Sequence, residues 1–490
     1  MLVYSKRTLV PLLLAFFLGL SACGGGGGGS SGGSGGSGGN GGGGAATDNV
    51  VIEFANAGGA FYVDDGTVRL RIGGATRAGT AVTAQSLRLV SDIDGAIAAT
   101  LALNSDVDIS LSSGTHQLTL SGEFAGGTTG STAIEVIVLP RRPQIPAGMK
   151  QAAGSRVKVP VVLVTYLPTK DGTTLDTDIA SYTVRPWGGN GLSNVYAWIE
   201  TLFVRKTFML TEMSRFRGYK NSADPYLGYE VVDHIVIYGA FPTNPYPPDT
   251  SRRIFDYAGV MDQIGGKTLV EDEGVKEIWL STYYAGDDVI LWESNMASLA
   301  TGDISNSDRR NTDLPVYEKT YVVYGMNYHR TQAEAVHNHG HQIEAMLDYL
   351  DLRDNGQRDI FWHSYVGAPN FPSSVTLDQT ACGWTHTPPY TNDNYGYLSA
   401  GETQSSCEDW RPDGSGARKA ISGAYIQALG YAWPSGTPPQ HRESNFYIWW
   451  GQNMPGLNNS IPYNGTTMAN WWQLMNDWDE SVASGARLYR

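Results

Sequence analysis

Several residue classes are scarce in this 490-residue chain, and each scarcity excludes a kind of protein. Only 17% of the residues are charged, and the formal net charge is −14 at pH 7. No cluster of lysine and arginine offers the positive surface that binds phosphate backbones, so we expect no nucleic-acid partner. Outside the glycine–serine run that follows Cys23, neither a phosphate-binding P-loop nor a G-x-G-x-x-G turn occurs, so we expect no nucleotide cofactor.

The amino-terminal apolar run is too short to cross a bilayer. Lys6 and Arg7 precede an apolar stretch at residues 8–19, which is followed by Leu20-Ser21-Ala22-Cys23. A positive start, a short apolar core and small residues are typical of an export signal. We therefore assign residues 1–22 to targeting and leave them out of the fold.

The residues Leu20-Ser21-Ala22-Cys23 resemble the lipobox of bacterial lipoproteins. The resemblance implies cleavage before Cys23, a diacylglycerol on its sulfur and an acyl group on the new amino terminus. Several acyl chains give durable attachment, so a membrane would be one partner and the cell envelope the location. Gly24 follows the cysteine, which in a Gram-negative cell implies the outer membrane. The alternative is an ordinary secretory signal with a chance cysteine.

Cysteine is otherwise rare, since only Cys382 and Cys407 remain after Cys23. An isolated pair in an exported protein predicts a disulfide. It would close a loop of about 25 residues and contribute roughly 3 kcal/mol to stability on the chain-entropy model.

The chain predicts several successive domains. Residues 23–48 contain the lipidated cysteine and a glycine–serine tether with almost no side chains to bury. Residues 49–139 alternate apolar and polar positions in short runs, which predicts an antiparallel β-sandwich. Within them, Gly114-x-His116 and a later G-x-T-G turn resemble bacterial immunoglobulin-like or PKD-like modules. Such modules are mostly spacers or adhesion units, and we expect His116 to be a structural turn residue.

Residues 140–157 predict a linker, and composition changes after them. All 13 tryptophans lie between Trp187 and Trp478. Apolar strands alternate with helical patterns in residues 158–490, which predicts a large α/β domain with a mostly parallel sheet and an aromatic-rich, loop-rich end. Segments such as GMNYHR and CGWTH-x-PP resemble a set of secreted bacterial proteins without an assigned activity, so the resemblance implies no reaction.

The sharpest chemical pattern is a predicted helix at residues 331–350. At about 100° per residue, His337 and His341 share one stripe with Glu334 and Glu344, while His339 faces the opposite side. A His-x-x-x-His pair offers two imidazoles to one metal ion, zinc or another divalent cation. The zincin signature needs a glutamate after the first histidine, and this chain has Asn338 there.

Several residues compete for the remaining roles at this site. A third metal ligand could come from Glu344, Glu334, His329 or the distant His386. The alternative is a polar helix face whose histidines and carboxylates only pair with one another. Because sites of parallel sheets lie beyond the carboxyl ends of the strands, we expect residues 327–330 and Glu293 nearby. Glu293 is predicted to end the strand 288–293 beside Trp292, a setting that suits a general base.

The sequence thus predicts a surface-anchored, metal-dependent hydrolase acting on an extracellular polymer, either peptide or glycan. Glu293, Glu344 and His329 are the catalytic candidates, and His337, His341 and His386 the metal ligands. One alternative is a glycan-binding or adhesion lipoprotein without catalysis, in which Trp449 and Trp471 stack on sugars. Another is a metal-free glycosidase that uses Glu293 with a second carboxylate.

Overall fold

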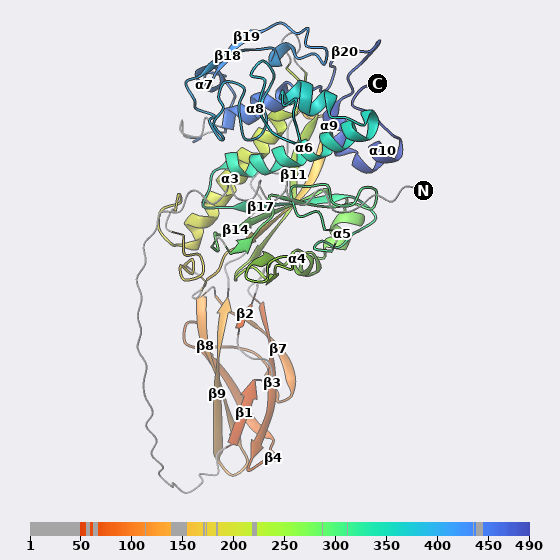
Figure 1. The fold of residues 1–490 in the computed structure, drawn as a ribbon. Helices are drawn as coiled ribbons and strands as arrows, with labels where there is room; N and C mark the ends of the chain where they lie inside the picture. Colours follow the sequence, from red (N-terminus) through yellow and green to blue (C-terminus); the bar gives the residue numbers. More distant parts are fainter. Residues whose placement is uncertain are drawn as a thin grey trace. The chain divides into compact units, whose positions relative to one another are not determined.

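A computed structural model describes most of the chain after the amino-terminal region. The described residues are 50–54, 59–61, 67–112, 114–138, 154–169, 172, 174–182, 185–217, 223–286, 288–310, 312–434, 436–437 and 444–490. The expected signal, Cys23, the tether and most of the expected linker lie outside these ranges. The chain divides into two compact units, residues 1–141 and 142–490, and its elements mix strands in several sheets with helices (Figure 1).

The first unit consists of two β-sheets that share one apolar core. One sheet contains β1 (Val50–Phe54), β3 (Thr67–Arg77), β4 (Thr80–Ala81) and β7 (Ser105–Ser110). The other contains β2 (Gly59–Phe61), β9 (Thr128–Val138), β8 (Gly114–Phe124), β5 (Ala84–Ser91) and β6 (Gly95–Ala96) in that order. All pairs are antiparallel except β2 with β9.

The alternating sequence pattern accounts for this core. Every second residue of β8 is buried, so Leu118 and Leu120 share one apolar core with Leu70 of the other sheet while their neighbours are more exposed. His116 lies inside β8 and not in a turn. Its buried ring contacts Ser91 Oγ at 2.8 Å through Nδ1 and the Ser112 carbonyl at 2.7 Å through Nε2, which is a structural role. Membership of the immunoglobulin-like group stays a prediction.

The second unit is built on a five-stranded sheet. Its order is β11 (Leu227–Ile237), β10 (Val157–Tyr166), β14 (Glu277–Thr282), β17 (Tyr321–Asn327) and β16 (Ser294–Ala297). The first four strands pair in parallel, and β16 adds an antiparallel edge. Strands β10, β14 and β17 are buried almost throughout, as their continuous apolar sequences predict for strands covered on both faces.

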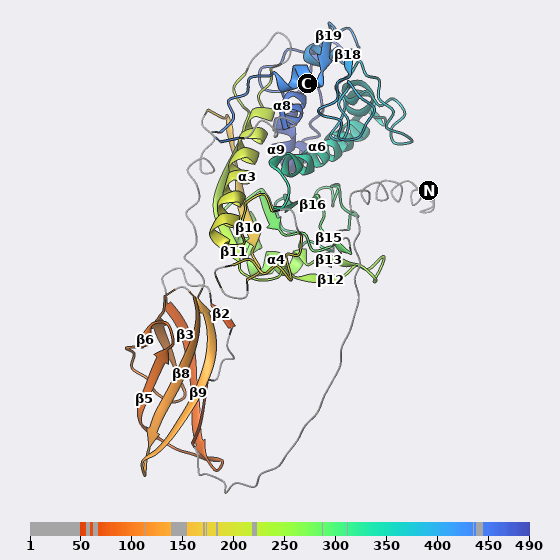
Figure 2. The same ribbon diagram turned by 90° about the vertical axis from the view of Figure 1, so that its left-hand side faces the viewer.

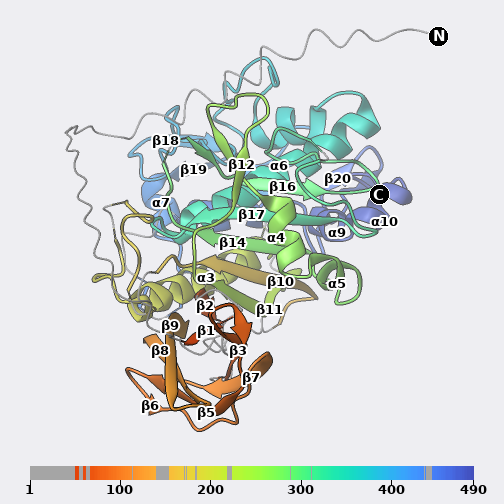
Figure 3. The ribbon, with the colours of Figure 1, turned by 90° about the horizontal axis from the view of Figure 1, so that it is seen from below.

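Helices cover both faces of this sheet. Helices α3 (Leu192–Met213), α6 (Gln332–Asn355) and α8 (Asn445–Gln452) lie on one side (Figure 2). Helices α4 (Tyr257–Gln263) and α5 (Gly266–Glu271) lie on the other (Figure 3). The shorter elements are β12 (Thr243–Pro245), β13 (Arg253–Phe255), β15 (Val289–Ile290), η1 (Asp359–Val366), β18 (Glu402–Ser405), η2 (Cys407–Asp409), β19 (Lys419–Ser422), α7 (Gly423–Gln427), β20 (Pro462–Tyr463), β21 (Thr466–Thr467), α9 (Trp471–Asn476) and α10 (Trp478–Ala483).

The aromatic-rich end of the chain builds core and not an exposed face. Trp449 is 3% exposed and Trp471 is 0% exposed. The Trp449 indole N–H donates to Glu408, and the Trp471 N–H donates to the Leu488 carbonyl. Composition could not distinguish buried from exposed rings, and the sugar-stacking role of these two residues stays a prediction that their burial disfavours.

Two further expectations are settled by the structure. The disulfide between Cys382 and Cys407 is formed, which confirms the predicted pair. The predicted strand 288–293 is confirmed only in part, because β15 covers Val289–Ile290 alone and Glu293 immediately precedes β16. Among the described residues, no helix is both long and apolar enough to span a membrane.

Candidate metal centre

Helix α6 brings the first two histidines of the site together. It starts at Gln332, five residues before His337 and shortly after β17, and is capped at its end by Gly356, whose φ of +67° suits a glycine. His337 and His341 lie one turn apart, as the spacing predicts, and both are buried. Gly340 lies between them. A Cβ there would be 2.5 Å from Thr385 Oγ1, so glycine allows the loop carrying His386 to lie against the helix.

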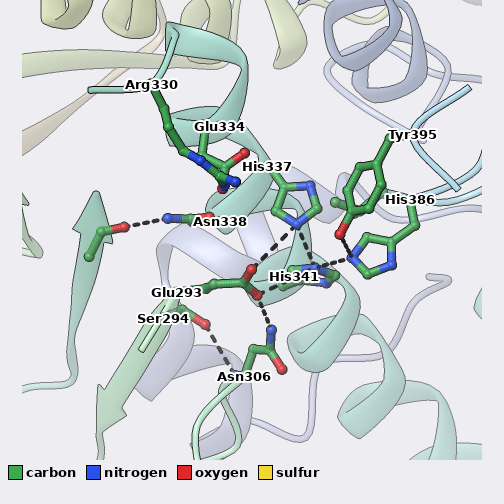
Figure 4. Close-up of polar contacts among 12 residues, drawn as sticks. Glu293, Ser294, Asn306, Arg330, Glu334, His337, Asn338, His341, His386 and Tyr395 are labelled. Carbon is green, nitrogen blue, oxygen red and sulfur yellow. Dashed lines mark hydrogen bonds and ion pairs between the residues drawn. The ribbon is translucent and has the colours of Figure 1, made fainter. Parts of the chain in front are cut away.

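Three ring nitrogens converge at this place (Figure 4). His341 Nε2 lies 3.0 Å from His337 Nε2 and 2.9 Å from His386 Nε2. One ligand atom from each of the three histidines lies within 4.8 Å of the others. His386 was one of four sequence candidates for the third position, and it is the one that joins the α6 pair.

A chain of hydrogen bonds fixes the tautomer of His337. The Tyr397 hydroxyl donates to the Thr385 carbonyl at 2.7 Å, so its oxygen must accept the proton of the Tyr447 hydroxyl 2.6 Å away. The Tyr447 oxygen then accepts from His337 Nδ1 at 3.1 Å. His337 therefore carries its proton on Nδ1, and its Nε2 presents a lone pair to the cluster.

A carboxylate fixes His341 in the same way. Glu344 Oε2 lies 2.9 Å from His341 Nδ1, and Glu344 Oε1 accepts the Thr385 N–H at 2.9 Å. With both oxygens engaged, Glu344 orients His341 and is not a free base or ligand. Carboxylates that hold the distal nitrogen of a histidine are typical partners of metal-bound imidazoles.

Lone pairs that face one another at 3.0 Å repel unless a cation lies between them. Four ligands at roughly 2.0–2.1 Å in a tetrahedron are separated by about 3.3 Å, close to the distances of 3.0 and 2.9 Å from His341 Nε2 to the other two nitrogens. The His337, His341 and His386 cluster can therefore hold a metal ion. The competing arrangement is a proton on one Nε2, shared within the cluster.

Glu293 lies beside the Nε2 atoms of His337 and His341. Its two carboxylate oxygens are 3.6 Å from His337 Nε2 and 3.5 Å from His341 Nε2, and Asn306 Nδ2 donates to Oε2. Burial alone would raise the pKa of this carboxyl, but the nearby His341, His337 and His386 hold it well below its usual range. Glu293 is therefore ionised and can accept either a metal bond or a proton.

The shifts in the histidine pKa values favour a proton on His341 over one on His337 or His386. Burial would lower the pKa of His341, but Glu293 and Glu344 raise it above its usual value. Burial and His341 lower the pKa of His337, and the same causes lower that of His386 to about 2. His337 and His386 are therefore neutral, which is the state that binds metal.

The other sequence candidates lie apart from the cluster. The His329 ring packs against Trp187 and Tyr182, with ring centroids 4.9 and 5.3 Å away. Glu334 forms an ion pair with Arg330 at the start of α6. Neither residue belongs to the group of histidines that can hold a metal ion.

Four contributors were missed by the sequence reasoning: Asn306, Tyr395, Tyr397 and Tyr447. Tyr447 lies on α8, and the others lie in segments without regular structure. No period or motif marks such residues, because their roles arise only when distant segments meet. The one usable signal was the density of tyrosine between His386 and Tyr397.

His339 occupies the opposite side of α6. Its Nε2 lies 2.9 Å from Glu277 Oε2, which also accepts the Trp279 N–H at 2.7 Å. Its ring stacks on Tyr324 with centroids 3.6 Å apart. Burial and the nearby Lys206 lower the pKa of His339 to about 4.

Comparison with known proteins identifies no family for this chain. The chain matches no known protein-family model and no curated protein sequence.

Proposed function

We propose that this protein is a metal-dependent hydrolase, anchored in the cell envelope through Cys23, that acts on an extracellular polymer. His337, His341 and His386 would hold zinc or another divalent ion. The observation that carries the proposal is the convergence of Nε2 atoms whose lone pairs are aimed by Tyr447 and Glu344. Three protein ligands plus an open position are typical of catalytic zinc sites.

Such an ion, when bound, lowers the pKa of a bound water and polarises a substrate oxygen. Two side chains of the protein would carry out the remaining steps. The Glu293 carboxylate borders the cluster beside two Nε2 atoms, so it would take the proton of the attacking water. Asn306 donates to Glu293 and thereby holds the carboxylate in place.

Two alternatives have less support. Sugar binding on Trp449 and Trp471 would require exposed rings, and both rings are buried. A metal-free glycosidase would need a second available carboxylate near Glu293. Glu344 is the carboxylate that shares the cluster, and both of its oxygens are engaged by His341 and Thr385.

The proposal is tested by metal content. Full-length protein purified without chelators would be compared by elemental analysis with a His337→Ala/His341→Ala variant. We expect about one divalent transition-metal ion per wild-type chain and none in the variant, because two ligands are lost. A panel of peptides and glycans would then be screened for hydrolysis by both proteins.

His363→Ala is the matched control, since His363 is partly exposed and pairs with Asp359 outside the cluster. The control should keep the metal and the activity. Wild-type protein that binds no metal even after reconstitution would refute the proposal. So would activity that survives in the folded double variant.

A further inference from the structure

Tyr395 is held in an unusual backbone conformation above the histidine cluster. Its φ is +61°, a left-handed value that bulky residues rarely adopt. Its backbone N–H donates to the His386 carbonyl at 2.6 Å, so the loop folds back on the histidine. Residues in such conformations persist where the surroundings impose them, and they are frequent at functional sites.

This conformation aims the Tyr395 side chain at the cluster. The ring lies over His386 and His337, with centroids 4.9 and 5.7 Å away. The hydroxyl points toward the converging nitrogens and lies 3.4 Å from His386 Nε2 (Figure 4). Glu293 and Tyr395 therefore both border the space onto which the three nitrogens converge.

The Tyr395 hydroxyl differs from those of neighbouring tyrosines. Tyr390, Tyr397 and Tyr447 are buried, and their hydroxyls bond to carbonyls or to one another. Tyr395 is 44% exposed, and among the described residues its hydroxyl contacts only His386 Nε2. If that lone pair binds a metal, the hydroxyl proton has no protein acceptor and is available to a substrate oxygen.

We propose that Tyr395 donates a hydrogen bond to the carbonyl oxygen of an amide or ester substrate as that oxygen becomes an anion. This inference rests on the proposed metal-dependent hydrolysis and narrows its substrate class. The substrate would be a peptide bond or an N- or O-acyl group on a glycan, and not a glycosidic bond. Tyr395 is then a catalytic residue, because its hydroxyl touches the reacting oxygen.

The step balances with water as the only co-reactant. The water oxygen attacks the carbonyl carbon, and one water proton passes to Glu293. The C=O electron pair moves onto the oxygen that faces Tyr395. That pair then re-forms the carbonyl as the bond to the amine or alcohol breaks. The leaving atom takes the proton held by Glu293, and a carboxylic acid remains, which ionises in solution.

A glycosidic bond gains nothing from this arrangement. Its cleavage develops positive charge on the sugar ring and no carbonyl anion, so a donor at this position stabilises nothing that forms. Preorganised donors of the present kind are characteristic of acyl transfer, where negative charge appears on one oxygen.

Acetohydroxamate tests the donor without any substrate, because its anionic oxygens mimic the developing charge at a metal. Its affinity would be measured by calorimetry on zinc-loaded full-length wild type and on Tyr395→Phe. We expect both proteins to hold zinc equally. The variant should bind acetohydroxamate roughly 10-fold or more weakly, the value of a hydrogen bond to a charged group.

Tyr182→Phe is the control, since Tyr182 is 37% exposed and packs near His329, outside the cluster. It should bind acetohydroxamate as the wild type does. Equal affinity in zinc-loaded Tyr395→Phe would overturn the donor role, and so would loss of zinc from that variant. Absence of zinc from the wild type would instead refute the proposed function.

The substrate class is tested by the products. Full-length zinc-loaded protein would be incubated with mixed peptides and with N-acetylated chitooligosaccharides. New amines together with carboxylates or acetate are expected, since both arise from carbonyl cleavage. New reducing ends on the oligosaccharides, with no amine or acetate released, would overturn the assignment.

Discussion

The two sides of helix α6 use the same residue type for different purposes. On one side, His339 meets a carboxylate at Glu277 and an aromatic ring at Tyr324, so its nitrogen has a protein partner. On the other, the Nδ1 atoms of His337 and His341 meet a hydroxyl and a carboxylate, while their Nε2 atoms face one another and lie 3.6 and 3.5 Å from the Glu293 carboxylate. Burial does not separate these histidines, since all three are at least 92% buried.

The difference is whether the polar atoms of each ring meet hydrogen-bond partners in the protein. A buried histidine whose polar atoms all meet protein partners stabilises the fold, as buried polar groups generally must. Two buried nitrogens whose lone pairs face each other repel, and a cation between them removes this repulsion. The side facing His386 can therefore hold an ion, and the side facing Glu277 anchors the helix to the sheet.

The largest expected effect tests the difference between the two sides of α6 directly. His386→Ala should lower the zinc affinity at least 100-fold, because one of three ligands is removed. His339→Ala should leave the zinc affinity within about threefold but destabilise the second unit by roughly 3 kcal/mol, since the buried Glu277 loses a partner. Zinc affinity would come from competition with a chelating dye.

Unfolding in both variants would be followed by tryptophan fluorescence. All 13 tryptophans lie beyond residue 186, so the signal reports only the second unit. The comparison fails if His339→Ala loses zinc as readily as His386→Ala while remaining folded.

A smaller effect concerns the groups that aim the nitrogens. Tyr447→Phe removes the acceptor of the His337 Nδ1 proton, and zinc affinity should fall roughly 10-fold to 100-fold, as for other partners of metal-bound histidines. The measurement is the same dye competition.

Tyr321→Phe is the matched control for this change. Tyr321 is equally buried, and its hydroxyl donates to the Pro315 carbonyl at 2.7 Å, outside the cluster. Similar losses of zinc affinity in both variants would show that general destabilisation, and not orientation of His337, is being measured.

Local periodicity in the sequence predicted the local part of this site. The helical spacing separated His339 from His337 and His341, and it put Glu344 on the correct stripe. It could not decide between Glu344 as a ligand and as an orienting partner, because that depends on the Thr385 N–H from a distant loop. His386, Glu293 and Tyr447 arrive from three other segments, and no local pattern fixes such meetings.

Composition was a poorer guide than periodicity. The alternation of residues 49–139 and the apolar runs after residue 157 correspond to observed strands. The tryptophan-rich end predicted a sugar-binding face, yet Trp471 packs against Tyr365 and Trp410 in the core. Large rings contribute most stability when buried, so their abundance alone does not indicate a binding surface.

The smallest expected effect sharpens the comparison through pH. His339 has a folded-state pKa of about 4, while an unfolded histidine titrates near 6.5. Between these values the unfolded chain binds the proton and the folded chain does not, so stability falls as the pH is lowered. The loss attributable to His339 is about 2 kcal/mol between pH 7 and 5.

This loss would be measured as the difference in unfolding free energy between metal-free wild type and His339→Gln. Glutamine keeps an N–H for Glu277 but does not titrate, so the variant should lack this part of the pH dependence. Identical pH profiles would mean that the buried site beside Glu277 does not hold His339 neutral, and the interpretation of this side of α6 would be wrong.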